Sequence, residues 1–390
     1  MTAQPKVSVI LTVYNMQACL RETLDCVFAQ TYENLEVIVV DDGSSDDSLS
    51  IIKEYAATDR RVKFRTRRNA GQGVSRNEGL DLASGDYVLM LDSDDIYDVR
   101  MVERMVERAV EADADIVVCR TAEFEDGSSE IVETPWTAKA EQLPAHDPFS
   151  WRDMADFAFT AFIGWPWDKL YKRSFLQAHN LRFPEMENSE DLYFVFFSLV
   201  LAERISVVDD VLAFHRIGRK GSVSNSRMIA PLAFYDGICM LKNALRERPQ
   251  DYAELEWGFL NWAFNYAIWN IESLPASTVR SEVAEQFVHG KLVELELDKH
   301  CRSYFASFDT DLQRFDALLR EVDGEDAVTT EEHVCAHPKA GYAAAFFTEA
   351  QLNGFGRAFG KAGAKVAGRS RTEQTAADPT ARGGAFFVHS

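Results

Sequence analysis

Three aspartates stand directly after a short apolar run, in the order Asp92, Ser93, Asp94 and Asp95. The run itself, residues 87–91, predicts a buried strand that meets solvent at Asp92. Carboxylates this close repel one another unless something positive lies between them. A hard divalent cation with oxygen ligands is the usual counter-charge, so the spacing indicates metal-assisted handling of a phosphate group. The alternative is an acidic turn that is merely solvated.

A second acidic strand end lies earlier in the chain. Residues 35–40 read as a buried strand that stops at Asp41 and Asp42. In open α/β sheets, ligands bind outside the carboxyl ends of the strands. If the two strands are parallel, this pair lies at the same edge of the sheet as Asp92 and Asp94.

The elements that must position these acids alternate regularly. Strands are predicted at residues 7–13, 35–40, 62–64, 87–92 and 115–119. Apolar positions at helical spacing predict intervening helices around residues 20–28, 51–55, 80–82 and 101–110. This alternation predicts an α/β fold with a mostly parallel sheet and helices on both faces.

The later part of the chain changes character. Two apolar runs within residues 205–214 flank Asp209 and Asp210 and predict a hairpin. Beyond about residue 228 the pattern is helical, and its aromatic stripe indicates a helix core rather than a ligand site: Phe259, Trp262, Tyr266 and Trp269. We therefore expect an α/β domain over residues 1–227, a smaller helical domain over 228–352 and a basic tail over 353–390.

Composition limits the classes of function. The 390 residues carry a formal net charge of -21, which argues against a nucleic-acid partner because a phosphate backbone requires clustered lysine and arginine. The six cysteines include no Cys-x-x-Cys pair, which favours reduced thiols in a cytoplasm. No segment has the length of a signal peptide or membrane span. The tail suggests either peripheral contact with anionic lipid headgroups or a flexible solvated end.

One further group of metal-ligand types occurs near the tail. His333, Cys335 and His337 alternate along the chain. Nothing nearby supplies a convincing fourth ligand, so these residues do not predict a zinc site.

Five short motifs occur in a fixed order in the first hundred residues. They are Val-Ser-Val-Ile-Leu-Thr-Val-Tyr-Asn at 7–15, Gln-Thr-Tyr at 30–32, Val-Val-Asp-Asp-Gly-Ser at 39–44, Ser-Arg-Asn-Glu-Gly at 75–79 and Leu-Asp-Ser-Asp-Asp at 91–95. Together they resemble glycosyltransferase family 2, a group of inverting enzymes with the Rossmann-like GT-A fold that use nucleotide-activated sugars. Residues 169–171, 190–194 and 214–216 look like the acceptor half of that family. The resemblance covers about residues 5–225 and implies little about the helical remainder.

The resemblance implies a site for a UDP-sugar. It places Asp42 against N3 of the base, where a carboxylate accepts a hydrogen bond from the imide N–H of uracil. Tyr14 is expected to stack on the base and Thr12 to supply a backbone contact. Arg76 is expected to bind phosphate or base oxygens with paired donors. A partly buried Tyr14 and a surface Arg76 are the alternatives.

The same resemblance assigns a metal, Mn²⁺ or Mg²⁺, to Asp94, with Asp92 reaching the ribose or the metal through water. His215 either completes the metal site or touches phosphate, or else packs within the fold. Arg219 and Lys220 resemble part of a mobile lid whose cations meet the diphosphate, with ordinary surface charge as the alternative. At an effective dielectric near 20, two unit charges 4 Å apart interact by about 4 kcal/mol, so unscreened acids would expel the diphosphate. A bound cation turns this repulsion between the acids and the diphosphate into a net attraction.

Asp191 is expected to be the catalytic base. Inversion at the anomeric carbon requires a base on the face opposite the leaving group, to take the proton of the attacking hydroxyl. Without that context, Asp191 would be a charge that stabilises a helix N-terminus. Trp165 and Trp167 offer flat faces for sugar stacking, or else pack in the core.

These expectations combine into a bacterial-type, metal-dependent hexosyltransferase. It would move a hexose or N-acetylhexosamine from a UDP-sugar to a glycan or lipid-linked glycan acceptor in surface polysaccharide or cell-wall assembly. The setting would be the cytoplasm or the inner face of the membrane, and an oligomer is compatible with the sequence. The alternatives are a catalytically silent glycan-binding or scaffold subunit, and a sugar nucleotidyltransferase. The latter is disfavoured because residues 14–18 lack a Gly-rich, basic triphosphate loop.

Overall fold

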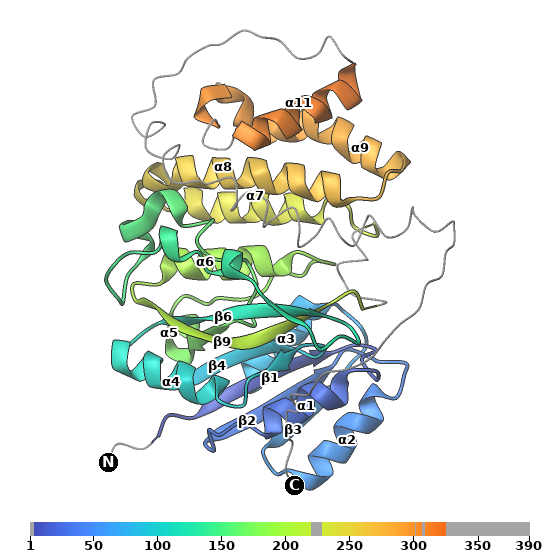
Figure 1. The fold of residues 1–390 in the computed structure, drawn as a ribbon, viewed down its shortest axis with the longest axis vertical. Coiled ribbons are helices and arrows are strands. Elements are labelled where there is room, and N and C mark those ends of the chain that lie inside the picture. Colours follow the sequence, from blue (N-terminus) through green and yellow to red (C-terminus); the bar gives the residue numbers. More distant parts are fainter. Residues whose placement is uncertain (1–3, 220–227, 301, 306–308, 325–390) are drawn as a thin grey trace, which may run out of the picture.

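The computed structural model describes residues 4–219, 228–300, 302–305 and 309–324. Its elements form layers around one sheet (Figure 1). Helices α1 (Leu20–Phe28), α2 (Ser48–Thr58) and α4 (Met101–Ala112) cover one face. Helices α3 (Gln72–Leu82), α5 (Arg173–Ala178) and α6 (Glu190–Leu201) cover the other. The predicted α/β architecture with helices on both faces is confirmed.

The sheet has two halves of different character. Its main path runs in the order β3-β2-β1-β4-β8-β6-β9-β5. The first half is parallel, as predicted, and consists of β1 (Val7–Val13), β2 (Leu35–Asp41), β3 (Val62–Thr66) and β4 (Tyr87–Asp92). The second half is mixed, because β8 (Lys169–Lys172) runs antiparallel to both β4 and β6 (Ile116–Glu125). Its remaining strands are β9 (Ile205–Ile217), parallel to β6, β5 (Ile96–Tyr97), antiparallel to β9, and β7 (Ile131–Glu133), antiparallel to β6.

Strands β1, β2 and β4 of the parallel half are buried on both faces, which explains their continuous apolar runs, whereas β3, at the edge of the sheet, is mostly exposed. On β1, Val9 and Leu11 pack toward α1, and Ile10 packs toward α3. Gly79 brings α3 unusually close to this strand, since a Cβ atom there would lie 2.3 Å from Ile10 Cγ2. Arg76, three residues before Gly79 on α3, lies within hydrogen-bond distance of Asp92 at the end of β4.

The predicted hairpin at residues 205–214 is wrong. Those residues belong to the single strand β9, which pairs with β6 throughout. The register skips Asp209 and Asp210, since Cys119 pairs with Val208 and the next residue of β6 with Val211. The two acids therefore form a bulge, where ion pairs to Arg120 and Arg104 compensate their charge. Acidic residues between apolar runs suggested a turn, but ion-paired charges are tolerated at a bulge.

The C-terminal region is helical, as predicted. Its elements are α7 (Ala233–Arg246), α8 (Pro249–Ser273), α9 (Thr278–Gln286), the π-helix η5 (Phe287–Lys291), α10 (Leu292–Glu294), η6 (Leu297–Lys299), η7 (Arg302–Tyr304) and α11 (Asp309–Asp323). Three 3₁₀ segments lie earlier, between β7 and β8: η1 (Pro135–Thr137), η2 (Ala140–Gln142) and η3 (Trp151–Phe157).

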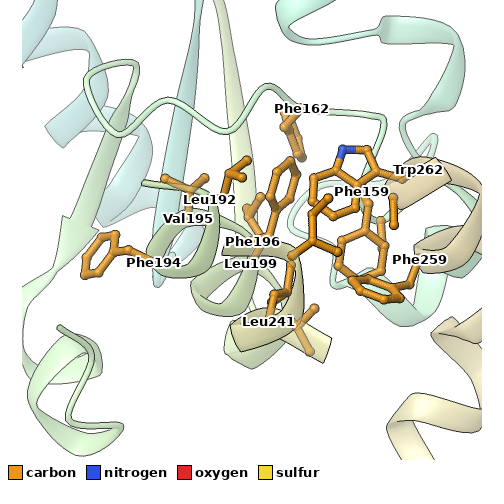
Figure 2. Packing of buried hydrophobic residues seen from close by; sticks show 14 of the residues in the cluster. Phe159, Phe162, Leu192, Phe194, Val195, Phe196, Leu199, Leu241, Phe259 and Trp262 are labelled. Carbon is orange, nitrogen blue, oxygen red and sulfur yellow. The ribbon is translucent and has the colours of Figure 1, made fainter. Parts of the chain in front are cut away.

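The C-terminal helices share a core with the α/β part. Figure 2 shows Phe159 and Phe196 packed against Phe259 and Trp262 of α8. This packing confirms that the aromatic stripe of α8 is helix core. The boundary at residue 228 stays a prediction, since the two parts are continuous in packing.

A buried anion stabilises the end of the sheet opposite the acidic strand ends. The carboxylate of Glu36 accepts hydrogen bonds from Ser8 Oγ at 2.7 Å, Lys63 Nζ at 2.7 Å and Ser84 N at 2.8 Å. Burial alone would raise the pKa of Glu36, but the Lys63 ammonium and the other donors hold it well below the usual range.

Among the described residues, no helix combines the length and apolar character needed to cross a bilayer. The tail, Lys220 and the group of His333, Cys335 and His337 lie outside those residues.

Candidate active site

The carboxyl ends of the central strands meet at one edge of the sheet. Asp92 closes β4 and lies in register with Thr12 of β1, which is itself adjacent to Val13, the partner of Asp41 on β2. The two acidic strand ends are thus neighbours across β1, as the sequence predicted. Tyr14 follows β1 at the same edge, with 46% of its surface exposed. That exposure leaves its ring available for stacking.

Asp92, Asp94 and Asp95 form the acidic cluster. One carboxylate oxygen from each lies within 4.8 Å of the others. Burial, together with the neighbouring charges of Asp95 and Asp92, raises the pKa of Asp94 to about 6. Oxygen ligands that repel one another at this spacing suit a hard divalent cation, so the residues fit the predicted Mn²⁺ or Mg²⁺.

Partners from the end of β9 hold two members of the acidic cluster. Asp95 is fully buried and contacts His215 Nδ1 at 3.0 Å and the backbone N–H of Arg216 at 2.8 Å. Arg219 donates from Nε to Asp94 Oδ2 at 3.0 Å. The end of β9 and the residues directly after it therefore orient these acids, through the side chains of His215 and Arg219 and the backbone of Arg216.

His215 has only one nitrogen left for a ligand. Asp95 engages Nδ1, so Nε2 remains, which is the arrangement of metal-binding histidines whose second nitrogen bonds a carboxylate. Burial alone would lower the pKa of His215, but the Asp95 carboxylate outweighs it and raises the pKa to about 9. A metal would compete with a proton for Nε2.

Arg76 bridges the acidic cluster to helix α6. Its guanidinium, 4% exposed, donates to Asp92 Oδ1 and to Glu190 Oε1, both at 2.9 Å. Gln72 donates to the same oxygen of Asp92, also at 2.9 Å. The sequence predicted Arg76 as a nucleotide ligand. Two of the five N–H donors of the guanidinium are used in these ion pairs, and the role as a nucleotide ligand stays a prediction.

Asp191 occupies the first turn of α6, beside Glu190. It forms no ion pair with a described side chain. Burial and the negative charge of Glu190, opposed by Arg76, raise the pKa of Asp191 to about 7. A carboxyl with a pKa near neutrality is suited to accept a proton at physiological pH.

Sequence reasoning did not single out Gln72 and Glu190 as site residues. Glu190 was visible only as a second acid beside Asp191, and a pair of adjacent acids does not reveal which one is buried against a cation. Gln72 stood in a Gly-rich loop without any charge pattern. Their roles arise from the position of α3, which is set by close helix packing.

The two acids after β2 hold the neighbouring loops. Asp42 accepts hydrogen bonds from the backbone N–H groups of Ala70 at 3.1 Å and Gly71 at 2.9 Å. Asp41 accepts from Ser44 N and from Thr66 Oγ1. Asp42 is 3% exposed, so reading a base would require it to share its carboxylate with these amides. The predicted contact with uracil is untested.

The tryptophans separate into two classes. Trp167 is 1% exposed and stacks on His215 with ring centroids 5.5 Å apart. It is therefore a core residue, which was one of the two alternatives. Trp165 is partly exposed and also contacts the His215 ring, at 5.1 Å.

Known proteins share both the sequence motifs and the fold. The family model for glycosyl transferase family 2 matches residues 8–178. Glycosyltransferase GlyG of Streptococcus pneumoniae is 31% identical over 225 residues, covering 56% of this chain and 72% of GlyG. EpsH of Bacillus subtilis, a candidate glycosyltransferase, is 35% identical over 218 residues, covering 55% of this chain and 61% of EpsH. Poly(ribitol-phosphate) beta-glucosyltransferase of Bacillus spizizenii is 28% identical over 67% of this chain and 40% of its own length.

A solved structure extends the similarity to the helical region. Residues 1–349 of Staphylococcus aureus TarS, in complex with UDP-GlcNAc, superpose with a TM-score of 0.62 at 21% identity. The match covers 81% of this chain and 89% of that one. At this identity the similarity concerns the fold. On its sequence motifs, its match to GlyG and this fold, the chain belongs to glycosyltransferase family 2.

Proposed function

We propose that the chain is a metal-dependent, inverting glycosyltransferase that moves a hexose or N-acetylhexosamine from a UDP-sugar to a glycan or lipid-linked glycan acceptor. One observation carries the proposal: the acidic cluster at the end of β4 is joined through Arg76 to the helix that bears Asp191. The buried Arg76 thus lies between the proposed donor site and the proposed base, which supports a joint role for them. The beta-glucosyltransferase relative, whose name specifies poly(ribitol phosphate), supports a hydroxyl-bearing polymer as acceptor.

Asp94 and Asp92 would hold the cation, with His215 Nε2 as a further ligand. The cation would neutralise the diphosphate and stabilise the departing nucleoside diphosphate. Asp95 fixes the His215 ring, and Arg219 lies where its guanidinium could exchange Asp94 for a phosphate oxygen. The structure around the acidic cluster therefore provides positive groups for both the acids and the leaving group.

Asp191 would act as the base on the acceptor side. As the acceptor hydroxyl attacks the anomeric carbon, its proton passes to the Asp191 carboxylate while the bond to the diphosphate breaks. Glu190 remains paired with Arg76, and its negative charge helps to raise the pKa of Asp191, so that Asp191 can accept a proton near neutral pH. The four described cysteines are free thiols, which supports a reducing compartment such as the cytoplasm.

A donor screen tests the proposal. The wild-type protein is incubated with Mn²⁺ and each of a set of nucleotide sugars, and release of free nucleotide is measured, with EDTA as the metal-free control. We expect release from at least one UDP-sugar, abolished by EDTA. Neither binding nor turnover of any nucleotide sugar would leave a silent glycan-binding subunit as the better interpretation.

Two variants assign the roles within the site. Asp191→Asn should keep the affinity for UDP and abolish transfer, because it removes the base without touching the acidic cluster. Asp94→Ala should weaken the Mn²⁺-dependent part of UDP binding. Substantial turnover in the first variant, or an unchanged metal effect in the second, would reassign the base or the ligand.

A further inference from the structure

A group of aromatic and acidic side chains lies beside the acidic cluster, on the side away from the nucleotide strands. The parallel half of the sheet, β1 to β4, carries Asp42 and Asp92, whereas β6 and β9 lie beyond β8. His215 joins the two regions, since its Nδ1 contacts Asp95 and its ring contacts Trp165. Whatever binds next to Trp165 is therefore a neighbour of the reaction centre.

Trp165 is half of an aromatic corner. The ring of Trp136, from segment η1, meets it edge to face with centroids 5.6 Å apart and an interplanar angle of 71°. Both indoles are partly exposed, while Trp167 stacks behind Trp165 at 4.8 Å and is buried. The corner is thus supported from within and keeps part of its aromatic surface in contact with solvent.

Segment η1 is fixed in place by buried hydroxyls. Thr121 of β6 contacts Thr134 Oγ1 at 2.6 Å and Thr137 Oγ1 at 2.8 Å. These contacts flank Trp136 in sequence and anchor it above β6. The position of Trp136 is consequently set by the sheet and not by its own contact with Trp165 alone.

Glu123 supplies a carboxylate at the same place. It lies two residues after Thr121 on β6 and pairs in register with His215 on β9, so its side chain is on the same face as the His215 ring. It is partly buried, and burial raises its pKa. Within the described residues, its carboxylate forms no hydrogen bond or ion pair. A half-buried acid without a partner is an acceptor available to a ligand.

We propose that Trp136, Trp165 and Glu123 form a subsite for a pyranose ring of the acceptor saccharide. The inference rests on the proposed glycosyl transfer and adds the residues that bind the acceptor. A pyranose offers an apolar face of C–H groups for an indole and hydroxyls around its edge. Glu123 accepts a hydrogen bond from one of those hydroxyls. The charged carboxylate gives this bond more strength than a neutral acceptor would.

The same chemistry is present in the sugar of the donor, so the experiment must separate the two. Initial rates of UDP release are measured with Mn²⁺ and the UDP-sugar found by the donor screen. Methyl β-glycosides of glucose, galactose and N-acetylglucosamine serve as acceptor probes. Separately, the probes are titrated against the protein with UDP and Mn²⁺ while intrinsic tryptophan fluorescence is recorded. The variants are Trp136→Ala, Trp136→Phe and Glu123→Gln, with Phe64→Ala as control, since Phe64 is a partly exposed aromatic residue on the distant strand β3.

For the variants we expect the KM for the glycoside to rise and the KM for the UDP-sugar to stay unchanged. Glu123→Gln should raise the glycoside KM about tenfold, because a charge-assisted hydrogen bond weakened by about 1.4 kcal/mol corresponds to that factor. Trp136→Ala should abolish the saturable fluorescence change and Trp136→Phe should retain much of the affinity, since it keeps a flat ring. Phe64→Ala should behave as wild type.

Three results would overturn the subsite. One is an equal rise in the KM for the UDP-sugar, which would assign the corner to the donor. Another is wild-type behaviour of both Trp136→Ala and Glu123→Gln. The third is the absence of any saturable fluorescence response of the wild type to the probes. The fluorescence titration does not require turnover, so a failure of the donor screen and a failure of the subsite are distinguishable.

Discussion

Removing the buried guanidinium of Arg76 should destabilise the protein strongly. Arg76→Ala leaves both Asp92 and Glu190 without their ion-pair partner. The side chain of Glu190 is 6% exposed, against 22% for Asp92, so water can compensate Asp92 but not Glu190. Stripping the partner from a buried charge costs about 3–5 kcal/mol, which we expect as the loss in the free energy of unfolding.

A double-mutant cycle isolates the bridge to α6. Glu190→Gln in the Arg76→Ala background replaces an uncompensated charge by a neutral amide, whose unsatisfied burial costs only about 1–3 kcal/mol. The double variant should therefore be more stable than Arg76→Ala alone, a coupling expected for groups in direct contact. Arg21→Ala is the matched control, because Arg21 pairs with Glu54 where both side chains are more than half exposed. We expect it to change nothing measurable.

The assay is urea unfolding followed by tryptophan fluorescence at pH 7.5, with midpoints and slopes compared across wild type and four variants: Arg76→Ala, Glu190→Gln, the double variant and Arg21→Ala. The reasoning fails if Arg76→Ala loses less than about 1 kcal/mol, the range of an exposed pair. It also fails if the double variant is less stable than Arg76→Ala.

Three further perturbations test the charges of the site and the core. The pKa of Asp191 is raised to about 7 and a base must be deprotonated, so kcat/KM should increase as the pH rises through about 7. Glu190→Gln should move this rise in kcat/KM to lower pH, because it removes a like charge beside Asp191. An unchanged pH profile would contradict the assignment of Asp191 as the base. The pKa of Glu36 is depressed in the folded state, so its contribution is complete above the ordinary value near 4.3 and is lost as the pH falls toward the folded pKa. The stability deficit of Glu36→Gln, about 1–3 kcal/mol at pH 7, should accordingly shrink in urea titrations below pH 4, and a constant deficit would refute it. Arg219→Gln should tighten Mn²⁺ binding in the absence of nucleotide, because the substitution frees Asp94 from its ion pair. The same variant should weaken UDP binding. Calorimetry that shows both affinities unchanged would remove Arg219 from the site.

The parallel half of the fold was predictable because local pattern and global position agree there. Strands β1, β2 and β4 are buried on both faces, and the two acidic turns follow the ends of β2 and β4, so periodicity alone located Asp42 and Asp92. Strand β9 was misread because the bulge at Asp209 and Asp210 is stabilised by arginines distant in sequence. A pattern of residues cannot show which distant charge will compensate an acid.

The site was predictable in its types of residue and less so in their partners. The motif that contains Arg76 indicated a cation near the nucleotide, but no pattern in the sequence shows that Asp92 and Glu190 form ion pairs with it. Likewise, Trp165 and Trp167 share one motif and differ in burial, since their exposure depends on η1 and β9. Contacts between elements that are far apart in the chain account for each of these gaps.

The three acids of the acidic cluster differ in how many of their oxygens remain for a cation. Both oxygens of Asp95 contact His215, and one also accepts from Arg216 N. Asp92 is bonded only through Oδ1, and Asp94 only through Oδ2. Asp92 Oδ2 and Asp94 Oδ1 therefore have no hydrogen-bond partner among the described residues.

This difference predicts an order of effects on the metal. Asp92→Asn and Asp94→Asn should each weaken Mn²⁺ binding at least tenfold, because each removes the charge of a direct ligand. Asp95→Asn keeps an oxygen that can accept from His215 Nδ1, so its effect should be smaller. Binding is measured by the loss of the free Mn²⁺ signal in electron paramagnetic resonance. If Asp95→Asn proves as damaging as Asp94→Asn, Asp95 itself must turn toward the metal, and the pairing with His215 must break on binding.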